Sequence, residues 1–186
     1  MARVILVTGG ARSGKSSHAQ KLAESLPGLR LFVATCPPCD DEMRQRIRVH
    51  QNRRSARGWD TVEETTDLLR VLKETTHHKV LLLDCLTLWI SNLLLEGQQK
   101  GAELTENAIE QRCRELLEAC AGREGTVIFV TNEVGAGIVP DNALARRFRD
   151  LSGRCNQVMA AGADVVVFLV CGIPTYLKGG ETCPGC

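Results

Sequence analysis

Eight consecutive residues carry the clearest chemical signal in this chain of 186 residues. Gly9 to Ser16 read Gly-Gly-Ala-Arg-Ser-Gly-Lys-Ser, which fits the phosphate-binding pattern G-x-x-x-x-G-K-[ST] at every required position. Glycines let backbone N–H groups and a helix N-terminus converge on one anion, while the lysine reaches the β/γ-phosphates and the final hydroxyl holds Mg²⁺. We therefore expect a nucleoside triphosphate site, rather than a glycine turn that only caps a helix, at Gly9, Gly10, Ala11, Arg12, Ser13, Gly14, Lys15 and Ser16.

A second chemical group stands at the end of an apolar run. Residues Val80–Asp84 are four apolar residues followed by an acid, the form of a buried parallel strand. Such a strand delivers a carboxylate to a phosphate loop, where it binds Mg²⁺ directly or through water. Strand-end aspartates also cap helices, and Asp84 could instead cap the helix expected near Thr87. Together with the phosphate loop, the pattern favours the magnesium role.

A histidine lies in a helical pattern at Asp41–Arg53. Met43, Ile47 and His50 are spaced i, i+4, i+7 and share one helical face. From this spacing, His50 either completes an apolar stripe or offers a neutral imidazole, a competent nucleophile toward phosphorus at neutral pH. Basic side chains that could neutralise a polyphosphate lie nearby at Arg46, Arg53 and Arg54.

Polar residues also follow other apolar runs. Glu63, four residues after Trp59, could accept hydrogen bonds from a sugar or a base. Glu133 leaves a strand and enters a glycine-containing loop at the same edge as the phosphate site, so it is a candidate general base toward a substrate hydroxyl. In the helix that follows, Leu144, Phe148 and Leu151 form the expected buried stripe, and the arginines are expected on other, solvated faces.

The elements that must position these groups alternate between strand and helix. Strands are expected at Val4–Thr8, Leu31–Thr35, Val80–Asp84, Thr126–Asn132 and Val165–Val170. Helices are expected at Ser16–Leu26, Asp41–Arg53, Thr65–Thr75, Thr87–Leu95, Leu104–Ala121 and Asn142–Ala160, with an exposed loop at Glu96–Glu103 and a loose tail at Lys178–Cys186. This order predicts an α/β fold of the P-loop type, a doubly wound and mostly parallel sheet, with ligands at the carboxyl ends of the strands. We expect one nucleotide-binding catalytic domain over residues 1–178 and a tail over 179–186.

Composition narrows the class of protein. The formal net charge is +1, which argues against a strongly electrostatic nucleic-acid binder. No stretch approaches the roughly 18 apolar residues that span a bilayer, and the apolar start is too short for a signal peptide. These features predict a cytoplasmic protein, in which most of the nine cysteines serve as small apolar residues rather than in disulfides.

Taken in order, these segments resemble the bifunctional adenosylcobinamide kinase/adenosylcobinamide-phosphate guanylyltransferase family of cobalamin biosynthesis. The resemblance spans roughly residues 4–178. It rests on the phosphate loop, Asp-Asp-Glu-Met followed by Arg-Ile-x-x-His, Trp59 to Glu63, Leu83 to Thr87, Asn92 to Leu94, Asn132 to Pro140, and Arg146 to Gln157. The histidine and Asn132–Pro140 segments are more specific than the phosphate loop, which many NTPases share.

The resemblance implies a RecA-like fold and a two-step enzyme with a corrinoid substrate. ATP or GTP would phosphorylate the aminopropanol hydroxyl of adenosylcobinamide, and GTP would then donate GMP to that phosphate through a covalent GMP–histidine at His50. The resemblance also implies a trimer with the site near a subunit boundary, and Mg²⁺ on Ser16 and Asp84. It places nucleotide contacts at Ala34, Thr35, Cys36, Gln51, Asn52, Arg53, Arg54 and Glu63.

Two C-x-x-C pairs depart from the family pattern. Cys36 and Cys39 lie between the second strand and the histidine helix, and Cys183 and Cys186 close the chain. Four thiolates could hold a structural zinc, and one pair could be redox-active. We expect neither a zinc site nor a redox-active pair. Instead, we expect the first pair to lie in an incidental loop and the second in a loose chain end.

Other readings stay open at this stage. A member with only one of the two activities, or another small-molecule kinase, would keep the phosphate loop. A RecA-like ATPase module that binds nucleic acid is a different class, which the near-neutral charge and the lack of an aromatic and basic strip disfavour.

Overall fold

The computed structural model describes residues 1–37, 45 and 55–180. Its elements are, in chain order, β1 (Arg3–Gly9), α1 (Lys15–Glu24), β2 (Arg30–Ala34), β3 (Trp59–Glu63), α3 (Leu68–Glu74), β4 (Val80–Asp84), α4 (Leu86–Gln99), α5 (Glu106–Ala121), β5 (Thr126–Val130), α6 (Ala143–Gly162), β6 (Val165–Val170) and β7 (Ile173–Lys178). The helix expected at Asp41–Arg53 lies outside the described residues, apart from one position.

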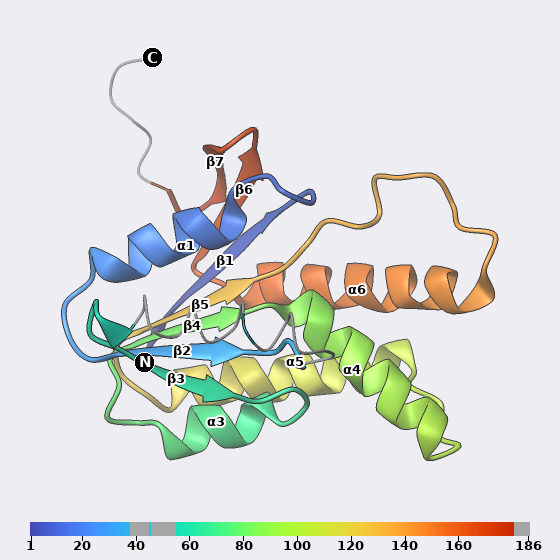
Figure 1. Cartoon of the computed structure of the whole chain (residues 1–186), viewed down its shortest axis with the longest axis horizontal. Helices are drawn as coiled ribbons and strands as arrows, with labels where there is room; N and C mark the ends of the chain where they lie inside the picture. The colour runs from blue at the N-terminus through green and yellow to red at the C-terminus, as the bar shows by residue number, and fades with distance from the viewer. Residues whose placement is uncertain (38–44, 46–54, 181–186) are drawn as a thin grey trace.

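The seven strands form one sheet in the order β3-β2-β4-β5-β1-β6-β7. All neighbouring pairs are parallel except β6 and β7, which form an antiparallel pair. The strands up to β6 therefore end at the same edge, as the arrowheads in Figure 1 show. The α/β, mostly parallel architecture predicted from the sequence is confirmed.

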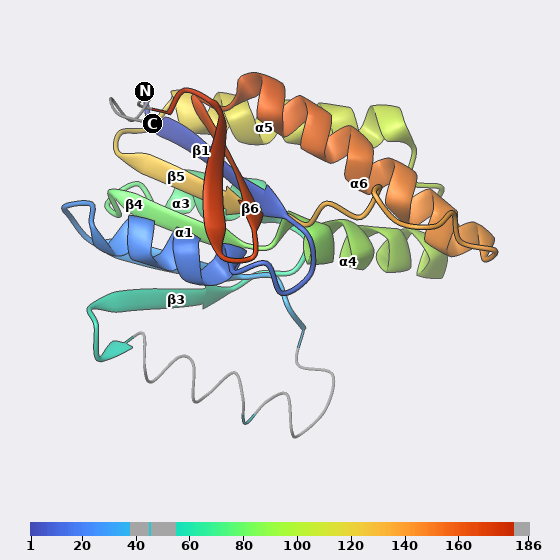
Figure 2. The ribbon, with the colours of Figure 1, turned by 90° about the horizontal axis from the view of Figure 1, so that it is seen from above.

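Helices cover both faces of the sheet. In Figure 1, α1 lies on one face and α3, α5 and α6 on the other, and Figure 2 shows α5 and α6 side by side. Alternate strand residues pack to opposite sides: Ile5 and Val7 join the core beneath α1, while Val4 and Leu6 join the core of the other helices. Apolar burial on both faces explains why these strands are continuous apolar runs.

Two strands at the edges were not expected from the sequence. β3 buries only Trp59 fully, and β7 is exposed along its whole length and contains Pro174. An edge strand needs few apolar side chains and tolerates proline, so neither has the pattern of a buried strand. Cys171 and Gly172, with φ values of 53° and 81°, form the tight turn that joins β6 to β7.

Three further expectations need correction. The loop was expected to span Glu96–Glu103, but α4 continues to Gln99. The chain then turns back, so that the Ala102 carbonyl oxygen lies against Gly97. The strand expected at Thr126–Asn132 ends at Val130, which leaves its last residues to the loop at the sheet edge. Leu144 was expected in the buried stripe of α6, but it lies in the first turn of the helix and is 38% exposed. Among the described residues, no helix has the length and apolar character needed to cross a membrane.

Candidate active site

The predicted phosphate loop joins the end of β1 to the start of α1. Gly14 precedes the helix with φ 95° and provides no side-chain cap, so the backbone N–H groups of the first turn are open to a ligand. Gly9 has φ 147°, and a Cβ there would lie 2.4 Å from the Leu169 carbonyl oxygen. The loop thus needs glycine at both positions, for conformation at Gly14 and also for space at Gly9. A pocket of about 300 Å³ lies in this loop and is lined by Arg12 to Ser17.

Lys15 is the buried cation of the loop. Its Nζ donates to the Gly10 carbonyl oxygen at 2.6 Å. Burial lowers the pKa of Lys15 from its ordinary value of 10.5, while the neighbouring Cys85 and Asp84 act to raise it. The Asp84 carboxylate is therefore close enough to act on Lys15 electrostatically, although β5 separates β4 from β1 in the sheet. This arrangement supports the expectation that the carboxylate and the phosphate loop belong to one site.

A buried hydroxyl fastens the ends of β2 and β4 together. Thr35 Oγ1 accepts from the Cys85 backbone N–H at 2.7 Å and donates to the Cys85 carbonyl oxygen at 2.8 Å. Asn92 in α4 donates from Nδ2 to the Thr35 carbonyl oxygen at 2.8 Å. Cys85, and not Asp84, is the residue that precedes α4 as its N-cap, so the helix-capping reading of Asp84 is wrong. The residue after β4 is thus held by the residue after β2, which α4 holds in turn.

The residues implied for magnesium have suitable chemistry. Ser16 is exposed in the first turn of α1, and Asp84 ends β4 at the same sheet edge. A hydroxyl and a carboxylate are the hard oxygen ligands that Mg²⁺ takes, with phosphate oxygens and water completing the shell. Among the described residues no group of three His, Cys, Asp or Glu side chains could hold a metal ion. A site made by one hydroxyl, one carboxylate and the substrate does not need such a group.

The other predicted nucleotide contacts divide into two sets. Ala34, Thr35 and Cys36 lie at the end of β2, and Glu63 is paired with Ala34 at the end of β3. The sheet therefore brings these four residues to one edge. The remaining predicted residues lie outside the described part of the chain: His50, Gln51, Asn52, Arg53 and Arg54, as do Cys39, Cys183 and Cys186.

The cysteines and arginines can be compared with their expectations. The six described cysteines are free thiols, and four of them are buried, as expected for small apolar residues.

The arginines of α6 are not all simply solvated. Arg146 donates to the Pro140 and Asp141 carbonyl oxygens, and Arg147 pairs with Glu103 and donates to the Leu104 carbonyl oxygen.

A polar network at the end of β5 was not assigned any role from the sequence. The hydroxyl of Thr131 donates to Asn156 Oδ1 at 2.7 Å, and Asn156 Nδ2 donates to the Asn132 carbonyl oxygen at 3.0 Å. The Asn132 backbone N–H donates to Thr87 Oγ1 at 2.7 Å. The sequence offered one signal for this network. Asn156 lies next to Cys155 and four residues after Ser152, and these two residues belong to the buried side of α6.

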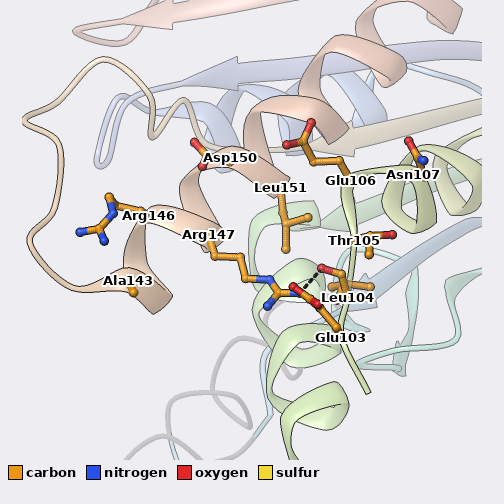
Figure 3. Close-up of a pocket in the computed structure, with 10 residues that line it drawn as sticks. All are labelled: Glu103, Leu104, Thr105, Glu106, Asn107, Ala143, Arg146, Arg147, Asp150 and Leu151. Atoms are coloured by element: carbon orange, nitrogen blue, oxygen red, sulfur yellow. Dashed lines mark hydrogen bonds and ion pairs between the residues drawn. The ribbon is translucent and has the colours of Figure 1, made fainter. Parts of the chain in front are cut away.

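A pocket of about 660 Å³ lies away from the phosphate loop, between the starts of α5 and α6 (Figure 3). Its charged side chains include Arg147, which turns toward Glu103 and Leu104 in Figure 3. The lining is Glu103, Leu104, Thr105, Glu106, Asn107, Ala143, Arg146, Arg147, Asp150 and Leu151. Of the two arginines in this pocket, Arg147 is paired with Glu103, whereas Arg146 donates to backbone carbonyl oxygens.

Comparison with known proteins decides the family. The model of the cobinamide kinase/cobinamide phosphate guanyltransferase family matches residues 5–177. The chain belongs to this family. Members of the cobinamide kinase/guanyltransferase family are enzymes, and this chain is accordingly a kinase and nucleotidyltransferase.

Relatives within the family match over nearly their whole length. The chain is 43% identical over 183 residues to the bifunctional adenosylcobalamin biosynthesis protein CobU of Salmonella typhimurium, an alignment that covers 94% of this chain and 99% of that protein. It is 41% identical over 178 residues to the bifunctional adenosylcobalamin biosynthesis protein CobP of Pseudomonas aeruginosa, covering 94% and 96%.

A solved structure shows the same fold outside the family. An ATPase from the type III secretion system of pathogenic bacteria superposes with a TM-score of 0.58 at 10% identity, over 90% of this chain and 51% of that one. The chain thus spans about half the length of that ATPase. The likeness confirms the RecA-like P-loop fold of this kinase/guanyltransferase family member.

Proposed function

We propose that this chain phosphorylates adenosylcobinamide on its aminopropanol hydroxyl and then transfers GMP from GTP to the new phosphate, giving adenosylcobinamide-GDP. The observation that supports the proposal is a phosphate loop after β1 and an acid that ends β4 at the same edge of the sheet, in a chain of the cobinamide kinase/guanyltransferase family. ATP or GTP serves the first step and GTP the second.

In the proposed first step the phosphate loop holds the nucleotide. The open N–H groups at the start of α1 and the Lys15 ammonium bind the β- and γ-phosphates. Ser16 and Asp84 would hold Mg²⁺, which supplies charge neutralisation on the transferred phosphoryl group. Positioning and electrostatic stabilisation account for most of the catalysis, because the loose transition state requires little covalent help from the protein.

In the proposed second step His50 is the nucleophile. Its neutral imidazole nitrogen attacks the α-phosphorus of GTP, a P–N bond forms, and the bond to the β-phosphate oxygen breaks to release pyrophosphate. The substrate phosphate then attacks the same phosphorus and the P–N bond breaks. By resemblance, Ala34, Thr35, Cys36, Glu63 and Gln51 to Arg54 contact the guanine nucleotide.

Labelled GTP tests this mechanism directly. The wild-type chain, incubated with GTP labelled at the α-phosphate, should retain label on a denaturing gel, lose it in acid and keep it in base. His50→Ala should abolish the label but still phosphorylate adenosylcobinamide. His77→Ala is the matched control, because His77 is exposed just before β4, at the opposite end of the sheet from the phosphate loop. Absence of label on the wild-type chain would refute the covalent mechanism.

The resemblance also supports an assembly. We propose a trimer in the cytoplasm, with residues 1–178 as the catalytic domain and His50 acting near a subunit boundary. Light scattering coupled to size-exclusion chromatography should give a mass of three chains. A monomeric mass at micromolar concentration would contradict this part of the proposal.

A further inference from the structure

The end of β5 lies directly beside the phosphate loop. β5 is the strand between β1, which carries the loop, and β4, which carries Asp84. The backbone N–H of Thr131 donates to the Val7 carbonyl oxygen at 3.0 Å, and that of Glu133 donates to the Gly9 carbonyl oxygen at 3.0 Å. Glu133 therefore stands against the first residue of the phosphate loop, between the phosphate site and the strand of Asp84.

The carboxylate of Glu133 is locally held. Its Oε1 accepts from the Gly135 backbone N–H at 2.8 Å. A Cβ on Gly135 would lie 2.9 Å from the same oxygen, so glycine leaves room for the carboxylate. Among the described carboxylates that follow parallel strands, Glu64 accepts from Thr66 and Asp67 and pairs with Arg70. Asp84 is assigned to the metal, and Glu63 lies at the far edge of the sheet on β3.

Asn156 anchors the segment from which Glu133 projects. Its amide bonds both Thr131 and Asn132, the two residues before Glu133. The single hydroxyl hydrogen of Thr131 goes to Asn156, so the Thr87 hydroxyl donates in its 3.3 Å contact with Thr131 while accepting from the Asn132 N–H. These hydrogen bonds form a closed ring that joins α6, α4 and the end of β5. The ring fixes the backbone beside the phosphate loop.

We propose that Glu133 is the general base of the phosphoryl-transfer step alone, and that Asn156 is the positioning residue that holds it. This inference rests on the proposed function. The substrate hydroxyl oxygen attacks the γ-phosphorus, the new O–P bond forms as the bond to the β-phosphate oxygen breaks, and the hydroxyl proton passes to the Glu133 carboxylate. Guanylylation of His50 needs no such base, because a neutral imidazole already presents a lone pair.

The half-reactions separate the two roles. Glu133→Gln should lower kcat for adenosylcobinamide phosphorylation by about 10²- to 10⁴-fold, while labelling of the chain by α-labelled GTP stays near the wild-type level. Asn156→Ala should lower the same kcat by about 10- to 100-fold with little change in KM for the nucleotide. Gln157→Ala, an exposed neighbour on α6, should leave both half-reactions unchanged.

A double variant distinguishes positioning from a merely structural effect. If Asn156 acts through Glu133, adding Asn156→Ala to Glu133→Gln should cost no further activity.

Several outcomes would overturn the inference. These are a Glu133→Gln enzyme with normal kinase activity, equal losses in both half-reactions for Asn156→Ala, or a further tenfold loss in the double variant. Failure of the proposed function looks different, because the wild type would then give neither phosphorylated corrinoid nor labelled chain.

Discussion

Thr35 and Cys85 are joined by two hydrogen bonds through a single hydroxyl, which accepts from the Cys85 N–H at 2.7 Å and donates to the Cys85 carbonyl oxygen at 2.8 Å. The hydroxyl is fully buried. It therefore satisfies both backbone groups of the residue that follows Asp84, and it ties the end of β2 to the end of β4.

Removing this hydroxyl should affect both stability and catalysis. Thr35→Val keeps the shape but leaves the Cys85 N–H unpaired and removes one of the two hydrogen bonds that the Cys85 carbonyl oxygen accepts, the other coming from the Trp89 N–H at 3.2 Å, so the free energy of unfolding should fall by about 1–3 kcal/mol. Because Asp84 precedes Cys85, the kinase rate should also fall, most clearly at limiting Mg²⁺. Denaturant unfolding and Mg²⁺ titration of the rate measure the two effects. Thr35→Ser retains the hydroxyl and is the control, so an equal loss in Thr35→Ser would contradict the hydrogen-bond explanation.

Two adjacent glycines in the phosphate loop should respond differently to the same added methyl group. A Cβ at Gly9 would lie 2.4 Å from the Leu169 carbonyl oxygen, whereas one at Gly10 would meet nothing within 4 Å. The obstacle at Gly9 is backbone and cannot rotate away, so Gly9→Ala should cost about 1–3 kcal/mol of stability. It should also weaken nucleotide binding by displacing the loop.

Gly10→Ala is the matched control for this substitution, and its melting temperature should stay near that of the wild type. Thermal unfolding and equilibrium titration with a fluorescent nucleotide would measure both variants. Equal melting temperatures for the two alanine variants would refute the steric account of Gly9.

The fold could be predicted from the sequence for the strands that are buried on both faces. Val80–Asp84 and Val165–Val170 match β4 and β6 residue for residue, because strands covered on both faces are continuous apolar runs. β3 and β7 escaped prediction for the opposite reason: an edge strand buries few side chains, so its sequence resembles that of a loop. Leu144 shows the limit of periodicity, since an apolar residue in the first turn of a helix can lie beyond the surface that the helix covers.

The site was predictable in part, for a related reason. Parallel strands end at one edge, so a phosphate loop after β1 and an acid that ends β4 were expected at the same edge of the sheet. The sequence does not say which strand lies between them, nor which helix packs against that strand's end. The contacts of Asn156 with Thr131 and Asn132 depend on that packing, and no local pattern could have assigned them. The nucleophilic role of His50 stays a prediction.

The buried thiols should be chemically inert in the native chain. Burial, and then the charge of Asp84, raises the pKa of Cys85 to about 11, and burial raises that of Cys120 to about 12. The thiolate is the nucleophile, so at pH 8 only about one Cys85 in a thousand is reactive. Iodoacetamide should therefore modify the exposed Cys171 long before either of them. Peptide mass spectrometry gives the order, with a chain unfolded in urea as the control in which all three react. Early labelling of Cys120 in the native chain would contradict the packing of α5.

Nucleotide binding should draw a proton onto Lys15 at alkaline pH. In the free chain burial lowers the pKa of Lys15 below its ordinary value of 10.5, so the ammonium begins to lose its proton in the range below that value. A bound polyphosphate favours the charged form and raises the pKa again. Between the two values the complex holds more protons than the free chain, and binding must take up the difference. Over the same range the free chain gains stability as pH rises, because its unfolded state binds more protons than the folded state.

Titration calorimetry in two buffers of different ionisation enthalpy measures this uptake. The apparent binding enthalpy should depend on the buffer at alkaline pH, with the sign of proton uptake, and this dependence should fade as the pH is lowered and Lys15 becomes charged in both states. Lys15→Met should remove the buffer dependence and weaken binding, since the variant has no proton to gain and no charge to offer the phosphates. Lys21→Met removes an exposed lysine from the last turn of α1 and should preserve the uptake. A buffer-independent enthalpy for the wild type throughout the alkaline range would mean that Lys15 keeps its proton without a ligand, and that its hydrogen bond to Gly10 and the charge of Asp84 outweigh the cost of its burial.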